Sequence, residues 1–244
     1  GGDVLVLNIY ILTLFPEFFE SPFSVSIIKR AIDRNLVKIE LINIRDFSHD
    51  KHKKVDDYPY GGGCGMVMKP EPIFESVEYV EKKIESTNRR IILLSPQGKI
   101  FNQAIAQELS CEQNLVFICG HYEGIDERVK TIITDEISLG DFILTGGEIP
   151  ALAVTDSVIR LVPGVLGSSD SPVNESFCNN LLEYPQYTRP EIYRGLKVPD
   201  VLLSGDHKKI EIYRRKAALI RTKEKRPDLF EKIELTEEDR KLLE

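Results

Sequence analysis

Strand-type and helix-type segments alternate through most of this chain, and this alternation restricts the fold more than any other feature of the sequence. Short apolar runs predict strands at Asn8–Leu14, Val37–Ile44, Arg90–Leu94, Leu115–Cys119 and Phe142–Leu144. Segments with helical character lie between them, at Ser24–Asn35, Glu71–Glu85, Phe101–Leu109, Ile125–Ile133 and Glu148–Leu161. Such alternation is typical of an α/β fold, with a parallel sheet and helices on both of its faces.

The periodic pattern stops at the segment PGVLGSSDSPVNES, residues 163 to 176. Proline, serine and acidic residues dominate it, as they do in interdomain linkers. We therefore expect a first domain over residues 1–165, a linker over 166–176 and a small helical domain over 177–244. In the small domain Asp206 is the expected N-cap of a helix. The predicted core stripe of that helix is Ile210, Tyr213, Ala217 and Ile220.

Composition excludes several classes of protein. The chain has 244 residues, of which 42% are hydrophobic, enough to bury a sizeable core. Its longest apolar stretch, Val4–Phe15, is shorter than the roughly 20 residues that cross a bilayer, and no secretory signal pattern surrounds it. The four cysteines contain no CxxC pair and the four histidines have no ligand spacing. We expect a cytoplasmic protein with no membrane contact and no metal site of its own.

Charge is distributed unevenly along the chain. The formal net charge is −7, yet residues 185–226 contain twelve Lys or Arg and only five Asp or Glu. A basic block on an acidic chain predicts contact with phosphates, and the tyrosines within YPQYTRPEIYRG are suited to stacking on unpaired RNA bases. The candidate RNA-binding residues are Arg189, Arg194, Lys209, Arg214, Arg215 and Arg221. A solvated helix face is the alternative interpretation of the same charges.

Three of the predicted strands run into glycine-containing loops, with the sequences IILLSPQG, LVFICGHYEG and FILTGG. Ligands of an open parallel sheet bind beyond the carboxyl ends of its strands, so the three loops are expected to line one pocket. The chain has neither a GK[ST] phosphate loop nor a GxGxxG turn between a strand and a helix. A nucleoside without phosphates, such as S-adenosylmethionine, therefore fits better than a nucleotide, with the glycine pair letting backbone groups close around it.

Five stretches carry a resemblance to a known family. They are LTLFPEFF, LLSPQG, CGHYEGIDERV, DEISLGDFILTGGEIPALAVTDSVIRLVPGVLG and YPQYTRPEIYRG, within Tyr10–Leu229. Together they resemble the bacterial tRNA (guanine-37-N1)-methyltransferases, the TrmD family of the SPOUT superfamily. The resemblance implies an S-adenosylmethionine-dependent α/β domain with a deep trefoil knot. It also implies a homodimer with its active sites at the interface, and a small helical C-terminal domain that binds tRNA.

The resemblance assigns cofactor-binding roles to the three loops. The matching residues of the first loop are Leu94, Ser95, Pro96 and Gly98, and those of the second are Gly120, Tyr122 and Glu123. Those of the third are Leu139, Gly140, Phe142, Leu144, Gly146, Gly147 and Pro150. His121 receives no role and is expected to be a partly exposed imidazole.

Two further residues are expected to carry the chemistry. Methylation of guanine N1 needs a base for its proton and a cation for the negative charge that develops on the neighbouring oxygen. Arg160 aligns with the catalytic arginine of the family, although an exposed pair with Asp156 is an alternative reading. Glu175 aligns where the family usually has aspartate, so the expected base stands one methylene further out; a solvated acid is its alternative reading.

Two other functions remain open from the sequence. One is a knotted methyltransferase that acts on ribosomal RNA, and the other is an RNA-binding factor without catalytic activity. The family resemblance also implies that Mg²⁺ assists methyl transfer, without a dedicated protein site.

Overall fold

The computed structural model describes residues 5–85, 87–121, 123–167 and 175–244. Contacts divide the chain into two compact units, Gly1–Gly167 and Ser168–Glu244. The boundary falls inside the expected linker 166–176, most of which lies outside the described residues. Each unit is described separately below.

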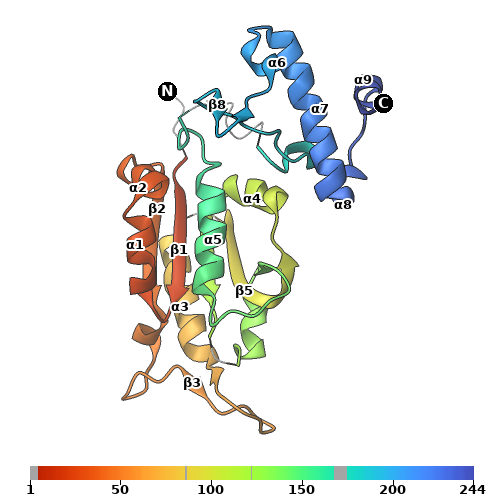
Figure 1. Ribbon diagram of the computed structural model, residues 1–244. Helices are drawn as coiled ribbons and strands as arrows, with labels where there is room; N and C mark the ends of the chain where they lie inside the picture. Colours follow the sequence, from red (N-terminus) through yellow and green to blue (C-terminus); the bar gives the residue numbers. More distant parts are fainter. Residues whose placement is uncertain (1–4, 86, 122, 168–174) are drawn as a thin grey trace. The chain divides into compact units, whose positions relative to one another are not determined.

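A five-stranded sheet organises the first unit, in the order β2-β1-β6-β5-β7 (Figure 1). Every adjacent pair of strands in it is parallel. The strands are β1 (Leu7–Thr13), β2 (Val37–Asn43), β5 (Arg89–Ile100), β6 (Asn114–Cys119) and β7 (Asp135–Ser138). The predicted parallel α/β sheet is therefore confirmed.

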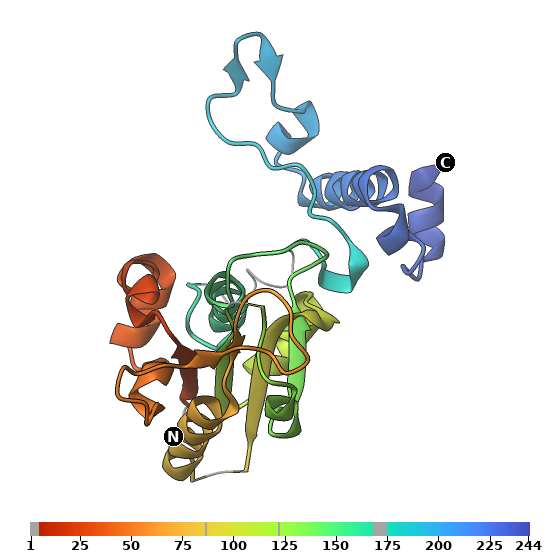
Figure 2. The same cartoon turned by 90° about the horizontal axis from the view of Figure 1, so that it is seen from below.

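Helices cover both faces of this sheet. Figure 2 shows α5 (Glu148–Ile159, green) and α3 (Pro70–Lys83, dark yellow) on opposite sides of it. The other helices of the unit are α1 (Glu20–Phe23), α2 (Ser26–Asp33) and α4 (Gln103–Ser110), with the 3-10 turns η1 (Pro16–Phe19), η2 (Ile44–Phe47) and η3 (Glu127–Thr131). A short hairpin joins β3 (Asp56–Asp57) to β4 (Val67–Met68).

The central strand β6 explains why the sheet has two cores. All six of its residues are buried, because alternate side chains enter opposite faces. Phe117 packs into the cluster that contains α5, whereas Ile118 packs into the cluster beneath α3. An uninterrupted apolar run is what such a doubly covered strand requires.

Two predicted elements of the first unit were wrong. The residues 142–144, predicted as a strand, lie in a loop where Phe142 and Ile143 are exposed, and the actual strand is β7. Charged residues hide β7 from a hydrophobicity pattern, but Asp135 is paired with Arg90 at 2.6 Å, which offsets the cost of placing it in the sheet. The predicted helix 125–133 contains only the 3-10 turn η3.

The second unit is built around one long helix, α7 (His207–Lys225), for which Asp206 is the N-cap, as predicted: its side chain accepts a hydrogen bond from Lys209 N at 3.1 Å. The remaining elements are η5 (Cys178–Asn180), β8 (Ile192–Tyr193), β9 (Leu196–Lys197), α6 (Asp200–Leu203), α8 (Pro227–Phe230) and α9 (Glu237–Leu243).

The predicted core stripe of α7 was wrong. The residues of the helix that become buried are Ala218, Leu219 and Thr222, not the stripe from Ile210 to Ile220. Thr222 accepts a hydrogen bond from Leu182 N at 2.9 Å, so the buried side of α7 is the one that faces the segment before it. Helical spacing alone could not identify that partner.

An ion pair between the buried Asp239 and the partly exposed Arg215 attaches α9 to α7. The Arg215 guanidinium donates to both oxygens of Asp239 at 2.8 Å, and Asp239 also caps α9 by accepting from Thr236 N at 3.1 Å. The hydrogen bonds from Arg215 lower the pKa of Asp239 to about 2. Arg215 is therefore committed to an internal structural contact.

We expect Asp239→Asn to destabilise the second unit by about 1–3 kcal/mol at pH 7, because the buried side chain at 239 loses the charge that accepts the hydrogen bonds of Arg215. A carboxyl pKa lowered in the folded state stabilises the protein above the unfolded value, about 4, and this contribution is lost as pH falls towards 2. Helical circular dichroism between pH 5 and pH 2 measures it. Asp228→Asn, which removes the partner of Arg226 in an exposed pair, is the control and should change little. Equal effects of the two variants would contradict a special role for the Arg215–Asp239 pair.

Candidate functional site

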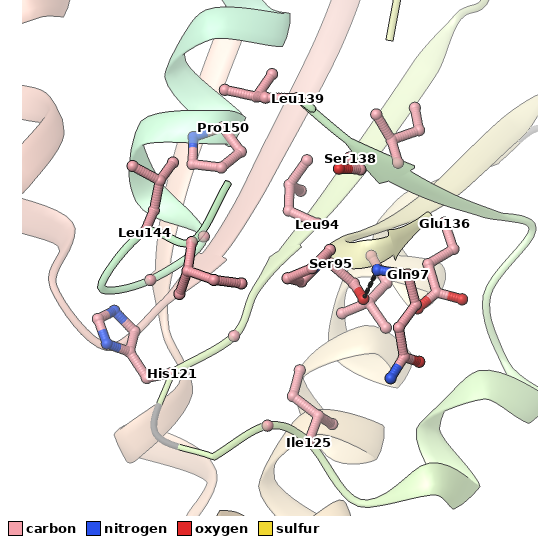
Figure 3. A pocket seen from close by; sticks show the side chains of 18 of the residues that line it. Leu94, Ser95, Gln97, His121, Ile125, Glu136, Ser138, Leu139, Leu144 and Pro150 are labelled. Atoms are coloured by element: carbon pink, nitrogen blue, oxygen red, sulfur yellow. Dashed lines mark hydrogen bonds between the residues drawn. The ribbon is translucent and has the colours of Figure 1, made fainter. Parts of the chain in front are cut away.

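The three glycine-containing loops meet at one edge of the sheet. They follow or interrupt β5, β6 and β7, which are neighbours in the sheet and parallel. A cavity of about 560 Å³ lies among them, a size typical of small-molecule sites. Figure 3 shows Leu94, His121 and Pro150, which come from three different segments, around this cavity.

Most of the residues expected to bind a cofactor line this cavity: Leu94, Ser95, Pro96, Gly120, Glu123, Leu139, Gly140, Phe142, Leu144, Gly146, Gly147 and Pro150. Gly98 is not in the lining, and Tyr122 lies outside the described residues. The lining also includes residues to which the sequence analysis gave no role, among them Gln97, His121, Ile125, Glu136 and Ser138 (Figure 3). Each of them lies in or close to one of the three loops, and this closeness in sequence to the assigned residues could have identified them.

Two glycines of the cavity loops lie in close contact with neighbouring backbone. A Cβ on Gly147 would stand 2.7 Å from the Cys119 Cα, and one on Gly98 would stand 2.4 Å from the Ile137 backbone nitrogen. Gly147 N also donates to Gly120 O at 2.9 Å. These glycines allow backbone segments to pack against one another, and this packing shapes the cavity.

A buried carboxylate connects two of the cavity loops. Glu148, at the start of α5 and 4% exposed, accepts a hydrogen bond from Thr13 Oγ1 at 2.7 Å. Its other oxygen lies 2.6 Å from His121 Nε2, and the His121 ring makes an edge contact with Phe15. The imidazole is thus only partly exposed, as expected, but it has a structural partner at the cavity wall.

The cavity lining is acidic. Glu123, Glu127 and Glu136 line it, and Lys130, the only Lys or Arg among the described lining residues, is shared by Glu127 at 3.2 Å and Glu136 at 3.5 Å. The Glu136 Oε1 atom is buried, and its contact with Lys130 Nζ at 3.5 Å is an ion pair without a hydrogen bond. Such a wall disfavours phosphates and suits a ligand that carries positive charge or hydroxyl donors.

The two expected catalytic residues do not line the cavity. Arg160 is the C-cap of α5, whose other end contributes Pro150 to the cavity. Ten residues of helix separate them, which corresponds to about 15 Å. Glu175 belongs to the second unit, where it is partly exposed. Within the described residues, no group of three or more His, Cys, Asp or Glu side chains is arranged to hold a metal ion.

The candidate RNA-binding residues of the second unit differ in their contacts. Arg215 is paired with Asp239, and Arg221 donates to Glu183 O at 2.9 Å. Arg194 and Arg214 lie over the rings of Tyr193 and Tyr184. The remaining two are exposed: Arg189 and Lys209. In the described part of the chain no helix is long and apolar enough to cross a membrane.

Fold and cavity together define an α/β protein with an acidic, small-molecule-sized cavity at the carboxyl edge of a parallel sheet. Residues 7–232 match the family described as tRNA (Guanine-1)-methyltransferase TrmD, and the chain belongs to this family. A tRNA (guanine-N(1)-)-methyltransferase of Dictyoglomus turgidum is 60% identical over 239 residues, covering 98% of this chain and 96% of the relative. An enzyme of the same name from Clostridium novyi is 59% identical over 241 residues and 98% of both chains.

The Gly147 contact generates a prediction about stability. We expect Gly147→Ala to lower the free energy of unfolding by about 1–3 kcal/mol, because the new methyl group meets backbone atoms that have no room to move. Gly167→Ala is the matched control, since a Cβ there meets nothing within 4 Å. Thermal unfolding of both variants is the measurement, and equal midpoints would show that the Gly147 contact is not tight.

The buried carboxylate generates a second prediction. We expect Glu148→Gln to destabilise the first unit by about 1–3 kcal/mol and to weaken binding of S-adenosylmethionine, because His121 loses a charged partner. Glu75→Gln removes the partner of His49 in an exposed pair of similar length, 2.8 Å, and should have no measurable effect. Denaturant unfolding and titration calorimetry test this pair of variants. Unchanged cofactor affinity in Glu148→Gln would show that the Glu148 carboxylate does not shape the cavity.

Proposed function

We propose that this chain transfers a methyl group from S-adenosylmethionine to N1 of guanine 37 in tRNA, next to the anticodon. The observation that supports this most directly is the acidic cavity, which is lined by residues of all three loops that the family resemblance assigns to the cofactor. Membership of the methyltransferase family supports the reaction class. We further propose that the protein works in the cytoplasm.

The cavity residues fit the methyl donor. Backbone groups of the 139–147 loop and the apolar side chains of Leu94, Leu139 and Leu144 are suited to hold an adenosine without phosphates. The carboxylates of the lining attract the positively charged sulfonium and amino groups, and the buried Glu136 Oε1, which receives no hydrogen bond, is an acceptor for a hydroxyl or ammonium donor. When bound, S-adenosylmethionine supplies an electrophilic methyl group.

Two residues of the chain are proposed to act on guanine. The Glu175 carboxylate accepts the N1 proton as the nitrogen attacks the methyl group. The Arg160 guanidinium stabilises the negative charge that develops on the adjacent guanine oxygen. Mg²⁺ is proposed to assist without a dedicated protein site.

We also propose a homodimer with its active sites at the interface. Its support is the position of Arg160, about 15 Å along α5 from the cavity residue Pro150 of the same chain. A second copy brings Arg160 of the partner subunit to the cavity without any rearrangement of α5. Each active site is then incomplete in a single chain.

The deep trefoil knot is proposed for the first unit. The chain leaves the edge strand β7, passes β5 and packs Gly147 against the end of β6 before α5 begins. That return path supports a threaded connection. The second unit is proposed as the tRNA-binding domain, through Arg189, Arg194, Lys209, Arg214 and Arg221. Arg215 also remains among the proposed RNA-binding residues, with its guanidinium paired to Asp239 inside the unit.

Methyl transfer to unmodified tRNA transcripts tests the proposed function. We expect transfer to a transcript with guanine at position 37 and none to the adenine variant. Glu175→Gln and Arg160→Ala should each lower the single-turnover rate by about a hundredfold or more, whereas Glu175→Asp, the usual family residue, should retain much of it. Transfer to ribosomal RNA alone, or no binding of S-adenosylmethionine in calorimetry, would contradict the proposal.

Mixing two inactive variants tests the shared active site. Glu136→Lys should block the acidic cavity, and Arg160→Ala should remove the oxyanion contact. If Arg160 acts on the cavity of the partner subunit, a heterodimer of these variants has one complete site, and mixing restores activity. A mixture as inactive as its components would place both residues in one chain's site. Mixing wild type with wild type is the control for subunit exchange.

A further inference from the structure

The second unit contains a cavity of its own, of about 380 Å³. It lies between the segment 185–191 and the helices α6 and α7, entirely within this unit. Leu202 and Ile210 supply apolar lining, and Arg214 of α7 supplies a cation. None of its residues belongs to the methyl-donor cavity of the first unit.

Arg214 is distinguished from the other arginines of α7 by its contacts. Arg215 is neutralised by Asp239, and Arg221 donates to a backbone carbonyl. The Arg214 guanidinium instead lies 4.8 Å over the ring of Tyr184, and its buried Nε has no hydrogen-bond partner. Within the described residues it has no carboxylate partner. A partly buried guanidinium without an anion costs free energy unless an external anion completes it.

The other lining residues define what that anion belongs to. Tyr187 offers an aromatic face, and the apolar side chains of Leu202 and Ile210 offer a surface for a flat ring. Arg189 adds a second cation beside the cavity. Apolar and aromatic walls combined with guanidinium groups are suited to an unpaired base and its phosphate, whereas a base in a duplex is stacked and cannot enter.

We propose that this cavity binds one unpaired nucleotide of the tRNA substrate, with the base against the apolar wall and the phosphate at Arg214. This rests on the proposed function, because it assumes that the substrate is tRNA. The nucleotide is distinct from the methylated guanine, whose acceptor site lies at the methyl-donor cavity. The cavity therefore recognises an unpaired nucleotide at a second position of the RNA.

Glu191 provides an internal check on this proposal. Glu191 is one of the lining residues, and its negative charge opposes a bound phosphate. Replacing it with glutamine keeps the size of the side chain and removes the repulsion. Because Glu191 is exposed, this variant does not threaten the fold.

Binding of a single-stranded RNA hexanucleotide, and of the same sequence in a duplex, tests the proposal. Arg214→Met should weaken binding of the single strand by about tenfold, and Lys216→Met, which removes the same charge from an exposed position of α7, should weaken it no more than about twofold. Glu191→Gln should strengthen single-strand binding more than Glu211→Gln, its exposed counterpart on α7. Binding of the duplex should change equally for Arg214→Met and Lys216→Met, and equally for Glu191→Gln and Glu211→Gln.

Three outcomes would overturn the nucleotide site. Equal losses for Arg214→Met and Lys216→Met would reduce it to general charge, and Glu191→Gln without an effect would place the phosphate elsewhere. Competition by inorganic phosphate equal to that by the hexanucleotide would mean that the base contributes nothing. Wild-type methylation of tRNA is measured alongside: if it occurs while the cavity variants behave as their controls, the proposed function stands and only the second site fails. Thermal unfolding verifies that Arg214→Met is folded.

Discussion

The close contact between Gly147 and the end of β6 is the constraint on which the first unit depends. It brings the loop after the edge strand back across the sheet, sets the start of α5, and closes one side of the cavity. No side chain larger than hydrogen fits at that point. The buried carboxylate next in sequence, Glu148, then links α5 to β1 through Thr13 and to the second loop through His121. The backbone packing at Gly147 therefore also determines the shape of the cavity.

The sequence predicted the parts of the fold that depend on local pattern. The strand at 115–119 is apolar throughout, and its burial on both faces follows from that run alone. β7 could not be found in this way, because Asp135 is stabilised in the sheet by an ion pair with Arg90, which lies 45 residues earlier in the chain. Conversely, Phe142 and Ile143 have a strand-like pattern but line a cavity, where apolar residues remain exposed. Apolar residues that line a cavity can therefore have the same sequence pattern as the residues of a buried strand.

The candidate site, like the fold, could be predicted from the sequence only in part. Most of the residues that the family resemblance assigned to the cofactor line the cavity, yet the resemblance gave no sign that Glu136 would present a buried oxygen that receives no hydrogen bond. The burial of one oxygen depends on the packing of several loops and is not encoded by any short motif. In the second unit, the choice of buried face on α7 depends on the segment that contains Leu182, which helical periodicity does not reveal.

The position of Cys119 has a consequence for the chemical durability of the cavity. This residue ends β6, is fully buried, and packs against Gly147. Burial, with a contribution from the charge of Glu148, raises the pKa of its thiol well above the usual range. A thiol that remains protonated is a poor nucleophile, whereas Cys64 and Cys111 are exposed to solvent. Oxidants and alkylating reagents therefore consume the surface thiols first and leave the strand beneath the cavity unmodified.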